Sequence, residues 1–73
     1  MGELAVISGR EVIAILAANG FIEVRQRGSH VVIQRRSETA TTTIPVPDHR
    51  QLAIGTLRSI IRQSGLPKAL FER

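Results

Sequence analysis

The sequence predicts a small α+β domain in which a three-stranded antiparallel sheet is covered on one face by two helices. Three observations support this α-β-β-β-α order. A helix start signal precedes an apolar stripe of helical spacing near the N-terminus, two runs of alternating apolar residues flank a Gly-Ser pair, and a second helical stripe follows a third strand. We expect residues 1–73 to form one domain with a small core, because 73 residues bury little apolar surface.

The first helix is expected from Ser8 to about Ala18. Ser8 and Glu11 have the spacing of a capping box, in which each residue satisfies a backbone N–H of the other. Asn19-Gly20 ends the helix, since glycine readily takes the left-handed conformation after a C-cap. The side chains expected to face the core are Val12, Ile13, Leu16 and Ala17, with Ile15 near the edge of this stripe.

Gly28 and Ser29 are expected to form the turn of a β-hairpin between strands at residues 21–27 and 30–35. A two-residue loop with glycine first is typical of a type II′ turn. The predicted pairs are Arg27 with His30, Arg25 with Val32, Val24 with Ile33, and Ile22 with Arg35. Alternation then directs Ile22, Val24, Val31 and Ile33 toward the helices. Arg25, Arg27, His30 and Gln34 lie on the opposite side, here called the open face. A one-residue slip would bury this polar set, so the pattern favours one register.

A third strand is expected over residues 41–46, with Thr42, Ile44 and Val46 facing inward. Pro45 lacks the N–H that a ladder requires, which places this strand at a sheet edge. The following helix either spans residues 49–64 or, as we favour, begins at Thr56 after a short turn over residues 50–53. Gly55 inside a helix costs about 1 kcal/mol relative to alanine, which favours the later start.

The second helix has an apolar stripe, an exposed side and a glycine cap. The stripe consists of Leu57, Ile60 and Ile61, and Arg58 and Arg62 lie on the exposed side. Gly65 ends the helix. Pro67 can then begin a short last turn in which Leu70 and Phe71 pack on the core.

The basic residues of the chain are almost all arginine. The formal net charge is +4, and Lys68 is the one lysine. Arginine presents a planar fork that matches phosphate oxygens, so this composition favours a polyanion such as nucleic acid over mere solubility. A solvated basic face is the alternative. The only aromatic residues are Phe21 and Phe71, which argues against a base-stacking platform for single strands.

Composition also limits location and cofactors. The chain has no cysteine, so disulfides and thiolate metal sites are excluded. Asp48 and His49 supply two metal ligands at most, and we expect no metal or other cofactor. The apolar lead-in Leu4–Ile7 is too short for a signal peptide or a membrane span, so a cytoplasmic protein is expected.

Five sequence pieces share a pattern with a known family. They are Ser8–Ile13, Gly20-Phe21, Arg25–His30, Val46-Pro47 and Gly55–Leu66. Through them the chain resembles the HicA family of bacterial toxins, the small RNases of HicA–HicB toxin–antitoxin pairs. The resemblance implies a fold like that of double-stranded-RNA-binding domains and cleavage of mRNA. It also implies that a HicB antitoxin binds the toxin in a complex and neutralises it. The resemblance places the catalytic histidine of the family at His30.

His30 suits metal-independent RNA cleavage, since a neutral imidazole near pH 7 can remove the proton of a ribose 2′-OH. The residues expected to contact RNA are Arg25, Arg27, Gly28, Ser29, Arg35 and Arg36. Ser29 is interpreted as a turn residue and not a nucleophile. His49 is interpreted as a loop or capping residue, with a second catalytic group as the alternative. Two other functions stay open: a non-catalytic RNA-binding module of similar fold, and a domain whose basic face binds an acidic protein.

Overall fold

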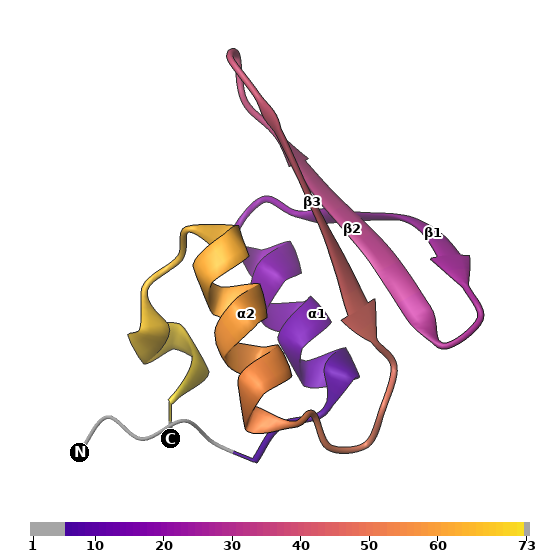
Figure 1. The fold of residues 1–73 in the computed structure, drawn as a ribbon. Helices are drawn as coiled ribbons and strands as arrows, with labels where there is room; N and C mark the ends of the chain where they lie inside the picture. Colours follow the sequence, from indigo (N-terminus) through magenta and orange to yellow (C-terminus); the bar gives the residue numbers. More distant parts are fainter. Residues whose placement is uncertain (1–5, 73) are drawn as a thin grey trace.

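The computed structural model describes residues 6–72 and has the predicted α-β-β-β-α order (Figure 1). The elements are α1 (Gly9–Ala18), β1 (Ile22–Arg27), β2 (His30–Arg36), β3 (Thr41–Pro47), α2 (Ile54–Ser64) and the 3-10 turn η1 (Lys68–Phe71). The strands form one antiparallel sheet in the order β1-β2-β3, so β3 occupies an edge as predicted. Both helices lie on the same side of the sheet.

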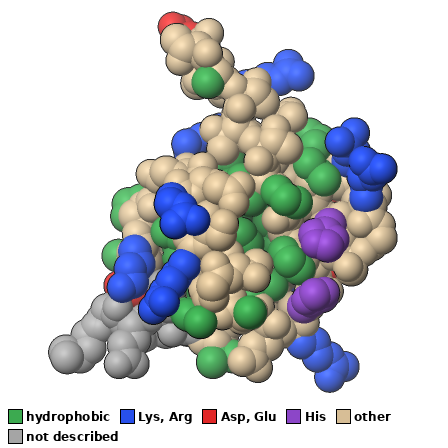
Figure 2. All heavy atoms as spheres, in the orientation of Figure 1, with side chains coloured by type: hydrophobic (Ala, Val, Ile, Leu, Met, Phe, Trp, Pro, Cys, Tyr) green, Lys and Arg blue, Asp and Glu red, His purple; other side chains and the backbone are tan. Residues whose placement is uncertain are grey.

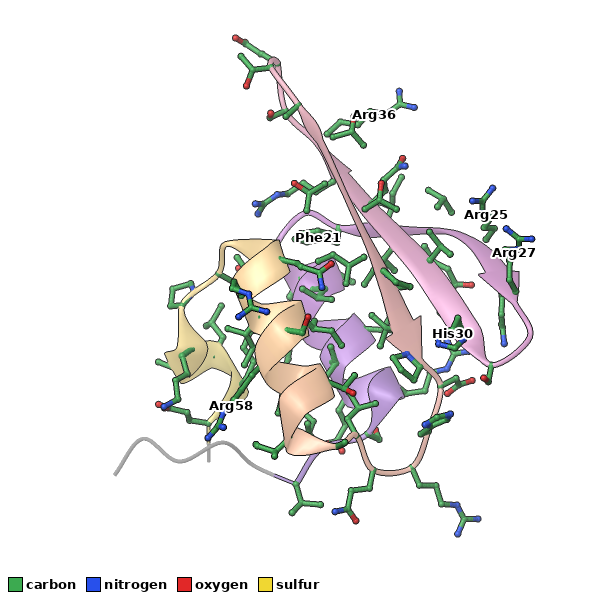
Figure 3. All side chains as sticks on the ribbon, viewed as in Figure 1. Phe21, Arg25, Arg27, His30, Arg36 and Arg58 are labelled. Atoms are coloured by element: carbon green, nitrogen blue, oxygen red, sulfur yellow. The ribbon has the colours of Figure 1, made fainter. Side chains whose placement is uncertain are left out.

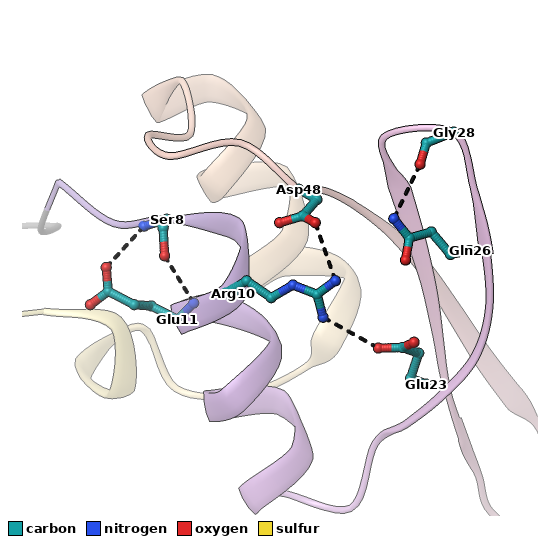
Figure 4. Close-up of polar contacts among 7 residues, drawn as sticks. All are labelled: Ser8, Arg10, Glu11, Glu23, Gln26, Gly28 and Asp48. Carbon is teal, nitrogen blue, oxygen red and sulfur yellow. Dashed lines mark hydrogen bonds and ion pairs between the residues drawn. The ribbon is translucent and has the colours of Figure 1, made fainter.

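The start of α1 confirms the predicted capping box. The Ser8 hydroxyl accepts a hydrogen bond from the Glu11 N–H at 3.1 Å, and the Glu11 carboxylate accepts one from the Ser8 N–H at 3.1 Å (Figure 4). Val12 and Leu16 are buried. Ala17 is exposed, contrary to the prediction, because it lies one position further around the helix than Leu16. Of the predicted apolar lead-in, Ile7 is buried and Val6 is exposed, and the first two residues lie outside the described range.

The hairpin turn is also confirmed. Gly28, the first residue of the turn, has a φ of 59°. Ser29, the second, does not have a positive φ, and this combination is what a type II′ turn requires. The first two predicted pairs, Arg27 with His30 and Arg25 with Val32, are present.

Beyond Arg25 the predicted register is wrong. Glu23 pairs with Ile33 and Ile22 pairs with Gln34, because a β-bulge between Glu23 and Arg25 accommodates Val24. The predicted pairs of Val24 with Ile33 and of Ile22 with Arg35 are therefore absent. Ile22 and Val24 are 64% and 42% exposed instead of packing on the helices.

The core lies between the inner face of the sheet and the two helices. Val31, Ile33, Ile44 and Val46 supply its sheet side, and Val12, Leu16, Leu57 and Ile60 supply much of its helix side. Phe71 of η1 closes the core at 1% exposure, whereas Leu70 is 42% exposed and does not pack there as predicted.

Helix α2 begins later than residue 49, as favoured, but two residues before Thr56. Ala53 is its N-cap, and Gly55 lies in the first helical turn. Arg58 and Arg62 are exposed, and Gly65 caps the helix with a φ of 71°. No helix within residues 6–72 is long and apolar enough to cross a membrane.

The outer edge of β3 carries two prolines. Pro45 lies opposite Val32, and Pro47 lies opposite His30. The next residue, Asp48, donates its N–H to the Ser29 carbonyl at 2.6 Å. Because successive N–H groups of a strand point to opposite sides, the nitrogens of Pro45 and Pro47 face away from β2. The outer edge therefore lacks a donor at both positions.

Candidate nucleic-acid interface

The open face of the sheet is formed by every second residue of β2 and the residues opposite them. His30, Val32, Gln34 and Arg36 alternate with the core residues of β2. Arg27 and Arg25 lie beside His30 and Val32 on β1. Figure 3 shows Arg25, Arg27 and His30 gathered toward the hairpin end of the sheet. The predicted grouping of one histidine with two arginines is therefore present.

His30 is held at the start of β2 by contacts of the backbone around it. It lies between Arg27 on β1 and Pro47 on β3, and its side chain is exposed. The Gln26 amide donates to the Gly28 carbonyl at 3.2 Å across the turn (Figure 4). The Asp48 N–H holds the Ser29 carbonyl from the other side. A Cβ on Gly28 would meet no atom within 4 Å, so the turn is open to an incoming ligand.

Arg36 shares the open face but lies at the far end of β2. It lies six positions after His30, which is a distance of about 20 Å along an extended strand. Arg36 is exposed, and Figure 3 shows it toward the distal end of the β2–β3 hairpin. It can contact an extended polyanion that also reaches His30 at the β1–β2 turn.

Arg35 does not join this surface. Its side chain lies on the helix side, where the guanidinium carbon is 4.6 Å from the centre of the Phe21 ring. Its two terminal nitrogens donate to the Asn19 carbonyl at 3.4 Å and the Ser64 carbonyl at 3.2 Å, at the C-terminal ends of α1 and α2. Arg35 thus joins the ends of both helices to the sheet. We leave it out of the proposed RNA-binding residues.

An open hollow of about 430 Å³ lies between β3 and α2, with His30 among its lining residues. The others are Pro45, Pro47, Gly55, Thr56, Ser59, Ile60 and Gln63. Sequence reasoning missed the contribution of α2. Thr56, Ser59 and Gln63 follow one another at spacings of three and four residues beside the buried stripe, which was the available signal.

The side chains of Asp48 and His49, which follow β3, have different surroundings. The Asp48 carboxylate accepts from Arg10 at 3.1 Å, and Arg10 also lies 3.5 Å from Glu23, so Asp48 faces α1 (Figure 4). The His49 carbonyl accepts from the Gly9 N–H at 2.9 Å, and its side chain is exposed. Figure 2 shows the two histidines on the same side of the molecule. Within residues 6–72, no three His, Cys, Asp or Glu side chains are grouped as metal ligands.

The fold and the open face define a small α+β domain with a basic, solvent-exposed sheet surface beside a histidine. Comparison with known families identifies it further. Residues 9–66 match the family model described as the HicA toxin of bacterial toxin-antitoxin, which spans most of the 73 residues. The chain belongs to the HicA toxin family, and the resemblance found in the sequence is confirmed. A search of curated proteins finds no match.

Proposed function

We propose that this toxin is a metal-independent endoribonuclease that cleaves mRNA with His30 as its general base. The observation that carries the proposal is the exposed imidazole of His30 on the open face, directly beside Arg27 and next to an unobstructed turn. Membership in a toxin family supports an activity that stops growth. The arginines supply the affinity for the phosphate backbone that such an activity requires.

The chemistry needs a base at the ribose and positive charge at the phosphate. His30 takes the proton of a 2′-OH, the 2′-oxygen attacks the adjacent phosphorus, and the bond to the 5′-oxygen breaks. The products are a 2′,3′-cyclic phosphate and a 5′-hydroxyl end. A water molecule protonates the leaving oxygen, and the resulting hydroxide takes the proton from His30. Arg25 and Arg27 are placed to stabilise the charge that develops on the phosphoryl oxygens. One positioned base accelerates such a reaction about 10²–10⁴-fold, so we expect a slow enzyme.

The partner proposed for this toxin is a HicB-like antitoxin that covers the open face. A cell that carries a growth-arresting RNase has to hold this enzyme inactive while it grows. Cover over Arg25, Arg27 and His30 would block both RNA binding and the base. The two proteins would then form a hetero-oligomer in which carboxylates of the antitoxin face the arginines.

The first prediction is that His30→Ala abolishes cleavage of RNA and growth arrest while the protein stays folded. The side chain is exposed and lies outside the core, so its removal leaves no cavity. The measurements are growth after induction at matched soluble levels, RNA cleavage in vitro, and a thermal unfolding curve. Equal toxicity of the two proteins would contradict the assignment of His30.

The same experiment separates the alternative functions. A non-catalytic RNA-binding module would bind RNA in both forms and cleave it in neither. A domain that binds only an acidic protein would show no affinity for RNA even at low salt, where phosphate contacts are strongest.

A further inference from the structure

We propose that the hollow between β3 and α2 is a nucleobase-binding subsite that selects the nucleotide next to the cleaved phosphate. The inference rests on the proposed RNase function and adds a specificity site to it. His30 lines the hollow, so a base placed there belongs to a nucleotide whose ribose or phosphate is beside the imidazole.

The distribution of charge separates this hollow from the phosphate contacts. Arg25 and Arg27 lie on β1, on one side of His30, whereas Pro45 and Pro47 lie on β3, on its other side. Of the residues that line the hollow, His30 is the only ionisable one. Figures 2 and 3 show basic side chains at the hairpin end and others, including Arg58, on α2 toward the opposite side of the molecule. A neutral hollow suits the uncharged part of a nucleotide and not its phosphate.

The lining provides hydrogen-bonding groups of the kind that recognise a base edge. The Gln63 amide nitrogen donates to the Ser59 hydroxyl oxygen at 2.9 Å. This bond orients Gln63 and leaves its carbonyl oxygen, its second amide hydrogen and the Ser59 hydroxyl proton available to a ligand. The Thr56 hydroxyl lies one turn earlier on α2. A base edge presents donors and acceptors together, which matches this mixed set.

The other walls are apolar and give the base a surface to lie on. Pro45 and Pro47 present their rings from β3, and the core residue Ile60 borders the hollow from α2. A volume of about 430 Å³ lies within the range of about 300–1,000 Å³ found for small-molecule sites. Such sites combine apolar walls with placed polar groups, and this lining offers both in similar measure. The RNA would then run from the hollow, past His30, to the arginines of β1.

The test compares the cleavage-site preferences of the wild type, Gln63→Ala and Ser59→Ala on an RNA of random sequence. Ends sequenced after partial digestion give the base frequency at each position around the cut. The wild type should prefer particular bases at one position beside the cut, and that preference should fall about tenfold in the variants, as expected for loss of a base-edge contact. Gln51→Ala is the matched control, because Gln51 is exposed and lies outside the hollow. It should retain the wild-type preference.

Two results would overturn the subsite. One is a wild type without any base preference, and the other is a preference that both α2 variants retain. A second measurement does not depend on cleavage: the four nucleosides are titrated into His30→Ala protein while backbone amide signals are followed by NMR. Signals of Thr56, Ser59 and Gln63 should shift with at least one nucleoside, and absence of such shifts would contradict the proposal. Shifts there with a wild type that cleaves no RNA would refute the RNase function and show that the hollow binds a base without serving cleavage.

Discussion

Arg35 and Arg36 are neighbours in the sequence but lie on opposite faces of the sheet. Arg35 rests on the Phe21 ring and donates to two helix-end carbonyls, whereas Arg36 is exposed on the open face. A cation at the C-terminal end of a helix also interacts favourably with the helix dipole. The two side chains have the same chemistry, but Arg35 stabilises the fold whereas Arg36 is available to a ligand.

The second prediction is that Arg35→Ala affects stability whereas Arg36→Ala affects RNA binding. Arg35→Ala should lower the free energy of unfolding by about 1–3 kcal/mol, because it removes a cation–π contact and two charged hydrogen bonds. Arg36→Ala should change stability by less than about 0.5 kcal/mol and weaken RNA binding. Urea unfolding and an RNA titration at fixed salt measure the two quantities. If the Arg35→Ala protein is as stable as the wild type but binds RNA poorly, Arg35 contacts RNA and its exclusion from the interface is wrong.

The third prediction concerns the products of the reaction. We expect cleavage to continue in EDTA and to leave 2′,3′-cyclic phosphate or 3′-phosphate ends, because a histidine base acts on the 2′-OH without a metal. The measurement is end-group analysis of RNA digested with and without EDTA. Activity that EDTA removes and Mg²⁺ restores, or products with 3′-OH ends, would contradict the proposed chemistry.

For single residues, the sequence predicted positions near the Gly28-Ser29 turn better than positions far from it. Pairing from Gly28-Ser29 correctly placed Arg27, Arg25 and His30. Each further pair depended on an unbroken strand, and the bulge at Val24 reversed the expected face of Ile22. A bulge leaves no distinct residue signal when an aliphatic side chain occupies it.

The start of α1 packs directly against the backbone at the end of β3. The Gly9 N–H donates to the His49 carbonyl at 2.9 Å, and a Cβ on Gly9 would collide with the Pro47 carbonyl oxygen. Since the obstacle is backbone, it cannot rotate away as a side chain would. The helix therefore sets the position of the segment that follows Pro47, next to His30.

The fourth prediction uses two glycine-to-alanine substitutions as a matched pair. Gly9→Ala should destabilise the protein by about 1–3 kcal/mol, as is usual for overpacking, and should slow cleavage by moving Pro47 relative to His30. Gly55→Ala, where a Cβ would meet no atom within 4 Å, should stabilise the protein by up to about 1 kcal/mol. Thermal or urea unfolding of both variants provides the measurement. Equal stability of the two variants would show that the contact between Gly9 and Pro47 relaxes easily.

The elements themselves followed from local signals, but their docking did not. The capping box of Ser8 and Glu11, the turn at Gly28 and the cap at Gly65 all depend on a few adjacent residues, and all were predicted correctly. The hollow depends on where α2 lies along β3, which is decided by packing between distant parts of the chain. That is why Ser59 and Gln63 were not recognised as site residues from the sequence.

Two pairs of arginines lie on separate surfaces of the molecule. Arg25 and Arg27 belong to the open face, whereas Arg58 and Arg62 lie on α2, where with Lys68 and Ile61 they line a separate hollow of about 270 Å³. Each Arg→Glu exchange lowers the net charge by two. Reversing either pair therefore brings the formal net charge from +4 to zero, so the two double variants differ only in location.

The fifth prediction is that RNA and the antitoxin compete for the open face. Reversal of Arg25 and Arg27 should weaken binding of both ligands more than reversal of Arg58 and Arg62, and the difference should shrink as salt screens the charges over about 10 Å at 0.1 M. In a direct test, antitoxin is titrated into labelled RNA bound to His30→Ala protein. Antitoxin should displace the RNA. A stable ternary complex at saturating antitoxin would show that inhibition acts from another surface.

The two prolines of β3 also govern how copies of this chain can meet. An exposed sheet edge invites an extra strand from a neighbour, which is a common route to aggregation. Along β3 such a strand would find no N–H at Pro45 or Pro47, and along β1 it would meet the bulge at Val24. Both edges of the sheet therefore discourage strand addition. Copies of this chain are thus kept from joining sheet edge to sheet edge, even though β1 exposes Ile22 and Val24.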